Sequence, residues 1–100
     1  MSSRNRYLSA GERVQAGKLP RFMHHAIAMI EGGSEVWLAK SVLEDDLQLS
    51  GFRVDYVEVA DAETLEPIEV LGARPTRLFV AARIGGTRLI DNMPIAPARA

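Results

Sequence analysis

Two hydroxyl side chains and a guanidinium stand close together at the beginning of the sequence, in Met1-Ser2-Ser3-Arg4-Asn5. Hydroxyls and backbone amides can donate hydrogen bonds to phosphate oxygens, and an arginine adds a charge-assisted pair of donors. Arg6 supplies a second positive charge. The pattern predicts a phosphate-binding loop, but a short Ser/Arg segment is also typical of a frayed N-terminus.

A second pair of cationic side chains is placed by a tight turn near the end of the sequence. Gly85-Gly86 predicts a two-residue hairpin loop, in which both positions can require positive φ. That register sets Arg83 directly opposite Arg88, and like charges in a cross-strand pair repel each other. We expect an anion near them, which is either a ligand phosphate, an acidic patch on another domain, or an acid of the same domain such as Asp55, Glu58 or Asp61.

The remaining polar and aromatic residues favour structural roles. His24 and His25 are adjacent, so a regular helix cannot turn both toward one metal ion, and no metal site is expected. Trp37 and Tyr56 are predicted to be core anchors, and the acids of residues 44–46 a solvated helix face. The absence of cysteine excludes disulfides, thiolate metal sites and cysteine nucleophiles.

Two helices are expected to position these residues. Ser9 and Glu12 form a capping-box pattern ahead of an apolar stripe that stops at Gly32-Gly33. Pro20 lies inside this pattern and predicts a kink or a break near Leu19. A second helix is expected to begin with Ser34 as its N-cap. The two stripes consist of Leu19, Phe22, Met23, Ala26, Ile27 and Ile30, and of Val36, Ala39, Leu43 and Leu47.

After Gly51 the sequence changes period and becomes rich in β-branched residues, which predicts strands over 52–60, 78–84 and 87–92. In the first strand, strict alternation would set Asp55 on the opposite face of the sheet from Val54 and Tyr56. Helices followed by hairpin-connected strands predict an α+β fold. We expect two main helices, the first kinked or split, packed on one face of a small three-stranded antiparallel sheet that ends in the Gly-Gly hairpin.

The composition is that of one small folded domain. The chain has 100 residues, a formal net charge of −1, 47% hydrophobic residues and 25% charged residues. It lacks an apolar run of about 18 residues, which a membrane-spanning helix needs. The first six residues are not followed by the apolar stretch of a signal peptide. These features predict a cytoplasmic protein that binds neither nucleic acid nor a membrane.

Three blocks of the sequence resemble the C-terminal domain of the pantoate–β-alanine ligases, the pantothenate synthetase family. The blocks occur in the family's order and are Met1-Ser2-Ser3-Arg4-Asn5-Arg6-Tyr7-Leu8-Ser9, then Asp55-Tyr56-Val57-Glu58-Val59 with Asp61 and Glu63-Thr64-Leu65, then Val80-Ala81-Ala82-Arg83 with Gly85-Gly86-Thr87-Arg88-Leu89-Ile90-Asp91-Asn92. The resemblance implies that residues 1–93 form the C-terminal lid domain of such an enzyme. Residues 94–100 are expected to be a flexible tail.

The resemblance also implies a chemistry, in which pantoate and β-alanine are joined with ATP and Mg²⁺ through a pantoyl-adenylate intermediate. By that match Ser2, Ser3 and Arg4 contact the ATP phosphates, and Met1 lies beside the nucleotide. Arg83 and Arg88 would contact an anion or the N-terminal domain of the same enzyme. No catalytic residue and no metal ligand is expected within this domain.

The sequence departs from the whole enzyme of this family. The family's nucleotide-binding N-terminal domain carries a His-x-Gly-His motif, whereas the adjacent histidines here have no glycine between them. We therefore expect the isolated domain to be inactive, and a homodimer only for the full-length protein. The alternative is a stand-alone, non-catalytic protein-interaction module. RNA binding is disfavoured by the near-neutral charge and by a lack of strand aromatics for base stacking.

Overall fold

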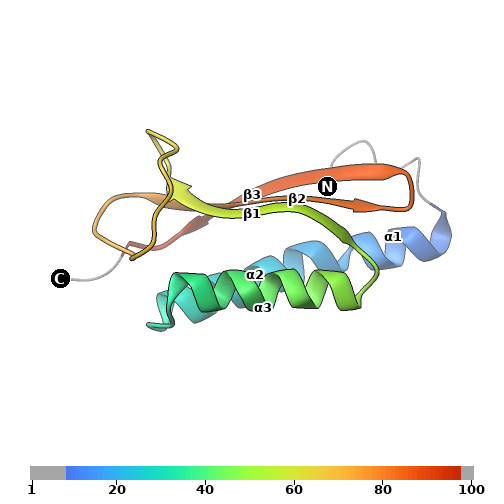
Figure 1. The fold of residues 1–100 in the computed structure, drawn as a ribbon, viewed down its shortest axis with the longest axis horizontal. Helices are drawn as coiled ribbons and strands as arrows, with labels where there is room; N and C mark the ends of the chain where they lie inside the picture. The colour runs from blue at the N-terminus through green and yellow to red at the C-terminus, as the bar shows by residue number, and fades with distance from the viewer. Residues whose placement is uncertain (1–8, 98–100) are drawn as a thin grey trace.

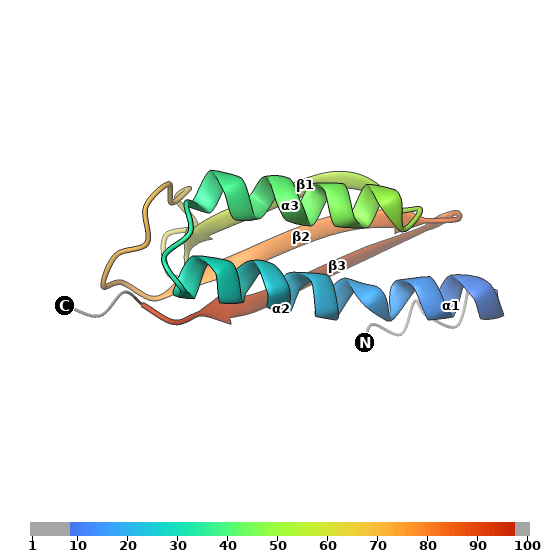
Figure 2. The same cartoon turned by 90° about the horizontal axis from the view of Figure 1, so that it is seen from below.

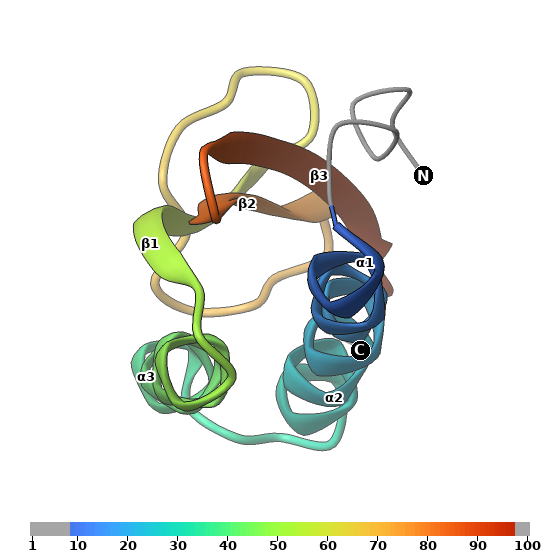
Figure 3. The ribbon, with the colours of Figure 1, turned by 90° about the vertical axis from the view of Figure 1, so that its right-hand side faces the viewer.

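The structure is a computed structural model that describes residues 9–97, and it has two layers. A helical layer lies beneath a three-stranded sheet, as Figures 1 and 3 show from the side and from one end. The elements in chain order are α1 (Ala10–Ala16), α2 (Lys18–Glu31), α3 (Val36–Leu49), β1 (Arg53–Asp61), β2 (Thr76–Ile84) and β3 (Thr87–Ile95). The predicted α+β fold is confirmed.

The first helical region is split, as predicted, and the split falls at Gly17. This residue ends α1 and precedes α2 with φ −63° and ψ −16°, so the chain continues in nearly the same direction (Figure 2). Pro20 then lies in the first turn of α2, where a backbone N–H has no partner within the helix. The proline therefore sets where α2 can begin and does not interrupt it.

Apolar stripes of α2 and α3 face the sheet and form most of the core. Every predicted member of the two stripes is buried except Phe22, which is half-buried at the edge of the core. The N-cap of α3 is Glu35, which makes no side-chain capping bond, so the prediction of Ser34 is wrong. The Ser34 amide instead donates to the Met29 carbonyl at 2.9 Å and closes the turn after α2.

The sheet is an antiparallel meander in the order β1-β2-β3. The hairpin register is the predicted one, with Arg83 opposite Arg88 and Ile84 opposite Thr87. Strand β3 continues through Pro94 to Ile95, which is 2% exposed and pairs with Thr76. The ordered sheet thus extends beyond residue 93, into the part expected to be a tail, because Ile95 returns an apolar side chain to the core.

The outer face of the sheet, which is the face turned away from α2 and α3, carries no helix in the described part of the chain (Figure 3). Tyr56 is 38% exposed there, and Phe79 lies on the same face between the buried Leu78 and Val80. Trp37 on α3 is 65% exposed. The expectation that Trp37 and Tyr56 anchor the core is therefore wrong, as is the premise that the strands present no aromatic side chain.

Candidate functional site

A three-residue charge cluster lies on the outer face near the Gly-Gly hairpin. Arg83 of β2 and Arg88 of β3 are cross-strand partners, and both donate through Nε to Oδ2 of Asp55, at 3.3 Å and 2.8 Å. One carboxylate thus bridges two guanidinium groups that would otherwise repel each other. Asp55 is the anion that the register of the hairpin required, and it comes from the same domain.

Asp55 reaches the arginines because β1 bulges at this residue. Val54 is opposite Ala82 and Tyr56 is opposite Ala81, so Asp55 is the extra residue between two paired ones. The bulge also returns Val54 to the core side, where it packs against the buried cluster. Strict alternation over this strand, as expected from the sequence, is therefore wrong at Asp55, and the bulge aims its carboxylate at β2 and β3.

The two guanidinium groups lower the pKa of Asp55 below its ordinary value of 3.8. The hydrogen bond from Arg88 has the largest effect, partial burial opposes it, and the charge of Arg83 adds to the lowering. Asp55 is therefore ionised at neutral pH. The other two acids considered have different partners. Glu58 Oε1 lies 3.6 Å from Lys40 Nζ, and Asp61 Oδ2 lies 3.0 Å from Arg74 Nε.

The carboxylate of Asp61 organises the turn that follows β1. It accepts hydrogen bonds from the amides of Glu63 and Thr64 at 2.8 Å and 3.0 Å, and these bonds lower its pKa most, with Arg74 contributing as well. Its side chain is only 4% exposed. Leu65, in the same turn, adopts φ 63°. Asp61 thus has a structural role that its partners account for.

The hairpin tip meets the beginning of α1 at the same end of the molecule. Ser9 and Glu12 form the predicted capping box, in which the Glu12 amide donates to Ser9 Oγ at 3.1 Å and the Ser9 amide to Glu12 Oε1 at 3.0 Å. The Glu12 carboxylate also lies directly against the backbone of Gly85. The hairpin tip and the capping box at the beginning of α1 therefore lie against each other.

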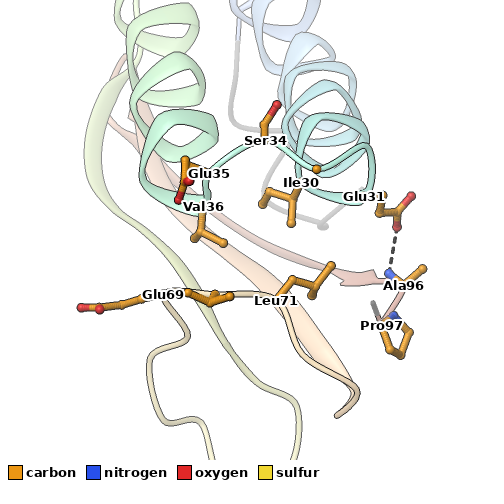
Figure 4. Close-up of a pocket in the computed structure, with 11 residues that line it drawn as sticks. Ile30, Glu31, Ser34, Glu35, Val36, Glu69, Leu71, Ala96 and Pro97 are labelled. Carbon is orange, nitrogen blue, oxygen red and sulfur yellow. Dashed lines mark hydrogen bonds between the residues drawn. The ribbon is translucent and has the colours of Figure 1, made fainter. Parts of the chain in front are cut away.

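A cavity of about 590 Å³ lies at the opposite end of the molecule (Figure 4). The residues that line it include the apolar Ile30, Val36 and Leu71 and the acidic Glu31, Glu35 and Glu69. The Glu31 carboxylate already accepts a hydrogen bond from the Ala96 amide at 2.8 Å, as the dashed line in Figure 4 shows. No residue singled out from the sequence as a candidate site lines this cavity, and no motif indicated it.

The described residues also bear on metals and membranes. Across residues 9–97, no three His, Asp or Glu side chains are grouped as ligands for a metal ion. His24 and His25 are both exposed, and His25 Nδ1 lies 3.9 Å from Asp46 Oδ2. None of the helices between Ala10 and Leu49 has the length and apolar composition needed to span a bilayer.

A sequence model of the family described as pantoate-beta-alanine ligase matches residues 1–94 of the chain. The chain belongs to this family. It is 52% identical over 98 residues to the pantothenate synthetase of Novosphingobium aromaticivorans and 50% identical over 99 residues to that of Rhizorhabdus wittichii. Pantothenate synthetase from Thermus thermophilus has the same fold, with a TM-score of 0.84 at 34% identity over 97% of this chain.

The match covers nearly all of this chain and only part of each relative. The chain spans 34% of the length of the Novosphingobium protein and 35% of the Thermus chain. The α+β fold, two helices on a three-stranded antiparallel sheet, is that of the C-terminal domain of pantothenate synthetase. The resemblance seen in the three sequence blocks is therefore confirmed.

The predicted site residues divide into those that the structure describes and those that it does not. Met1, Ser2, Ser3 and Arg4 lie outside the described residues, so their contact with ATP stays a prediction. Arg83 and Arg88 come together around Asp55. Sequence reasoning missed the contact between Glu12 and Gly85, although the capping box and the glycine pair were both visible as separate patterns.

Proposed function

We propose that this chain serves as the phosphate-contacting lid domain of a ligase that joins pantoate to β-alanine with ATP. The match to the pantoate–β-alanine ligase family over residues 1–94 carries this proposal. The match over about a third of each relative accords with one domain of a larger enzyme. The sequence lacks the family's His-x-Gly-His motif, so the domain by itself is not expected to make pantothenate.

The N-terminal block performs the chemistry of the proposed role. Pantoate's carboxylate attacks the α-phosphorus of ATP, pyrophosphate leaves, and the amine of β-alanine then displaces AMP from pantoyl adenylate. Negative charge builds on the α-phosphate and the leaving pyrophosphate during the first step. Ser2, Ser3 and Arg4 donate hydrogen bonds to these oxygens, and Met1 lies beside the nucleotide. Donors fixed in place before the reaction stabilise this charge most effectively.

The described part of the chain supplies the framework for this block. The capping box orders the beginning of α1, and the hairpin packs against Glu12 of that box. Movement of the whole domain as a lid would exclude water and protect the acyl adenylate from hydrolysis. The described residues offer no cluster of metal ligands, so we assign the chain no step that involves Mg²⁺.

The charge cluster fits a role at the boundary with the rest of the enzyme. Arg83 has a side chain that is 49% exposed, and it uses Nε to bind Asp55. A guanidinium has five N–H donors, so further donors of Arg83 can face an acidic group on the N-terminal domain. Arg88 would support this contact through the shared Asp55. We place the complete enzyme in the cytoplasm and expect its homodimer to form mainly through the other domain.

A chimeric ligase tests this function. This chain replaces the matching third of the Novosphingobium aromaticivorans pantothenate synthetase, with which it shares 52% identity. The chimera is expected to catalyse pantoate-dependent exchange between pyrophosphate and ATP. Arg4→Ala should lower its rate about 10²- to 10³-fold, the usual loss when one charge-stabilising donor is removed.

The matched control is Arg21→Ala, which removes an exposed arginine of α2. It should leave the rate of the chimera within about twofold, since a surface substitution of this kind changes little else. Pantoate-dependent exchange by the 100-residue chain itself would contradict the proposed lid role. A rate unaffected by Arg4→Ala, together with a lowered melting temperature, would show that Arg4 is structural.

A further inference from the structure

A groove on the surface of the domain exposes a tryptophan side chain. It runs between the beginning of α3 and the segment 66–71 that follows β1, and its volume is about 420 Å³. This Trp37 groove has an apolar lining of Val36, Trp37, Ile68 and Val70. Trp37 is 65% exposed and Val70 is 78% exposed, so two large apolar side chains present most of their surface to solvent along one groove.

Both walls of the Trp37 groove are fixed by the fold. One wall is the first turn of α3, where Val36 is 4% exposed and belongs to the core. The other wall is held beside β1, because the Ile68 amide donates to the Val59 carbonyl at 2.8 Å and Ile68 packs against the buried cluster. The groove is therefore a property of the folded domain.

Two carboxylates flank the groove. Glu35 and Glu69 line it and also line the neighbouring cavity of about 590 Å³, so they lie where the two hollows meet. Figure 4 shows both side chains on one flank of that cavity and Glu31 on the other. Within residues 9–97, neither carboxylate forms a hydrogen bond or an ion pair. The rim of the Trp37 groove is therefore acidic.

The positive charges close to the groove do not neutralise this rim. Lys40 also lines the groove, but its Nζ lies 3.6 Å from Oε1 of Glu58. The N-terminus of α3 carries a partial positive charge of about half a unit, which offsets only part of the charge of Glu35. The groove thus combines an exposed indole ring with two carboxylates. This combination binds a cation through the ring face and the carboxylate oxygens.

We propose that the Trp37 groove binds an extended basic segment of a partner protein, in which an arginine side chain is next to an apolar one. The arginine stacks on Trp37 and forms ion pairs with Glu35 and Glu69, and the apolar side chain covers Val70. Arginine fits better than lysine, because its planar guanidinium both stacks on aromatic rings and pairs with carboxylates through two donors. The groove is bounded by exposed side chains, so it suits an extended chain better than a small molecule, which needs an enclosing pocket. This role does not rest on the proposed ligase function, which uses other residues.

Trp37 can report on its own groove, because it is the one tryptophan of the sequence. The probe is the peptide acetyl-Leu-Arg-Leu-Arg-amide, which has no aromatic residue, added to the 100-residue chain. Saturable binding should shift the emission of Trp37 to shorter wavelength and lower its quenching by acrylamide. The expected dissociation constant lies between about 10 μM and about 1 mM, as for a weak and small interface. Acetyl-Leu-Glu-Leu-Glu-amide should have no effect, and acetyl-Gly-Arg-Gly-Arg-amide should bind at least about fivefold more weakly, since it has no apolar side chain to bury.

Charge variants test the acidic rim. Glu35→Gln combined with Glu69→Gln should weaken binding of the leucine-arginine peptide about 4- to 25-fold, since each exposed ion pair contributes about two- to fivefold. The matched control is Glu44→Gln combined with Asp45→Asn, which removes two acids from the same helix about two and a half turns away and gives the same net charge. It should change the affinity less than about twofold, because charges beyond a Debye length of about 8 Å are largely screened. Circular dichroism verifies that both variants are folded.

Several results would overturn the proposal. One is an emission of Trp37 that does not respond to the leucine-arginine peptide well above the expected range, or that responds equally to the glutamate or the glycine-arginine peptide. Equal affinities of the rim variant and the control variant would also overturn it. Emission that changes with protein concentration alone would assign the groove to a second copy of the chain.

The chimeric ligase supplies the last measurement. The indole N–H resonance of Trp37, assigned with Trp37→Phe, should respond to the leucine-arginine peptide in the chimera as it does in the 100-residue chain. A resonance that does not respond would show that the rest of the ligase covers the groove, and the proposal would fail. The catalytic activity of the chimera tests only the proposed function, so the two failures are distinguishable.

Discussion

Replacement of Leu43 by alanine should show how strongly the helical layer is bound to the sheet. Leu43 is 0% exposed in the middle of α3, and this helix packs against both α2 and β1. The substitution removes three carbons, each worth about 0.8 kcal/mol when buried, and leaves a cavity. The total loss should be about 3–5 kcal/mol.

That loss is large for a domain of this size. Domains of up to about 100 residues lose roughly 4–8 °C of melting temperature for each kcal/mol, so Leu43→Ala should melt roughly 12–40 °C lower. The midpoint of urea unfolding should fall by about 2 M, with an unchanged slope. Circular dichroism in the far ultraviolet, recorded during heating and during urea titration, measures both quantities.

Leu49 provides the matched control in the same helix. It is 88% exposed, so Leu49→Ala should change the free energy of unfolding by less than about 0.5 kcal/mol. A difference between the two variants of only a few degrees would refute the packing of α3 described above. It would mean that the stripe of α3 is not held against the sheet in solution.

Two further predictions concern charge and exposure. Asp55 has a lowered pKa in the folded chain, so it contributes stability above its ordinary pKa of 3.8 that is lost as the pH falls through the lower folded value. Thermal melts should therefore show that Asp55→Asn loses less stability than the unmodified chain as the pH falls from about 5 to about 2. The control is Asp45→Asn on the exposed face of α3, which should follow the unmodified chain. Trp37, the one tryptophan of the sequence, is 65% exposed, so its fluorescence should be readily quenched by acrylamide in the folded state and should shift little on unfolding in urea. Strong protection of Trp37 from the quencher would contradict its position on the surface.

The hairpin was the most predictable part of the fold. A two-residue Gly-Gly loop leaves one register for the strands beside it, and that register alone set Arg83 against Arg88. Two like charges in one cross-strand pair then required an anion nearby. Which acid supplied it could not be read from the sequence, because the answer depends on a one-residue bulge in β1 at Asp55.

The aromatic residues were less predictable, because size and apolarity do not fix which side of an element a residue occupies. Trp37 follows Val36 by one position in α3, about 100° around the helix, and so lies beside the buried stripe and not within it. Tyr56 falls on the outer face of the sheet because it alternates with the buried Val57 and Val59, so size and apolarity did not place it in the core.

The candidate site was predictable in its parts and not in its assembly. The capping box at Ser9 and Glu12 and the hairpin loop at Gly85-Gly86 are local patterns that the structure confirms, although only Gly85 of the pair has a positive φ. Their contact joins Glu12 to Gly85, which are far apart in the chain, and no local pattern reports it. The role of the N-terminal block was suggested by family resemblance, and it stays a prediction.

The meander topology has a consequence for how the domain acquires its structure. Neighbouring strands in the sheet are also consecutive in the chain, and α2 and α3 are joined by a short turn. Local partners of this kind reduce the loop entropy that is lost while the sheet forms, whereas the packing of α2 on β3 joins parts that are far apart in the chain. Such a domain can fold as a unit during synthesis, independently of the order in which the other parts of a ligase fold. The same independence would allow it to be exchanged between related ligases as one cooperative piece, together with the hairpin and the helix cap that meet at its end.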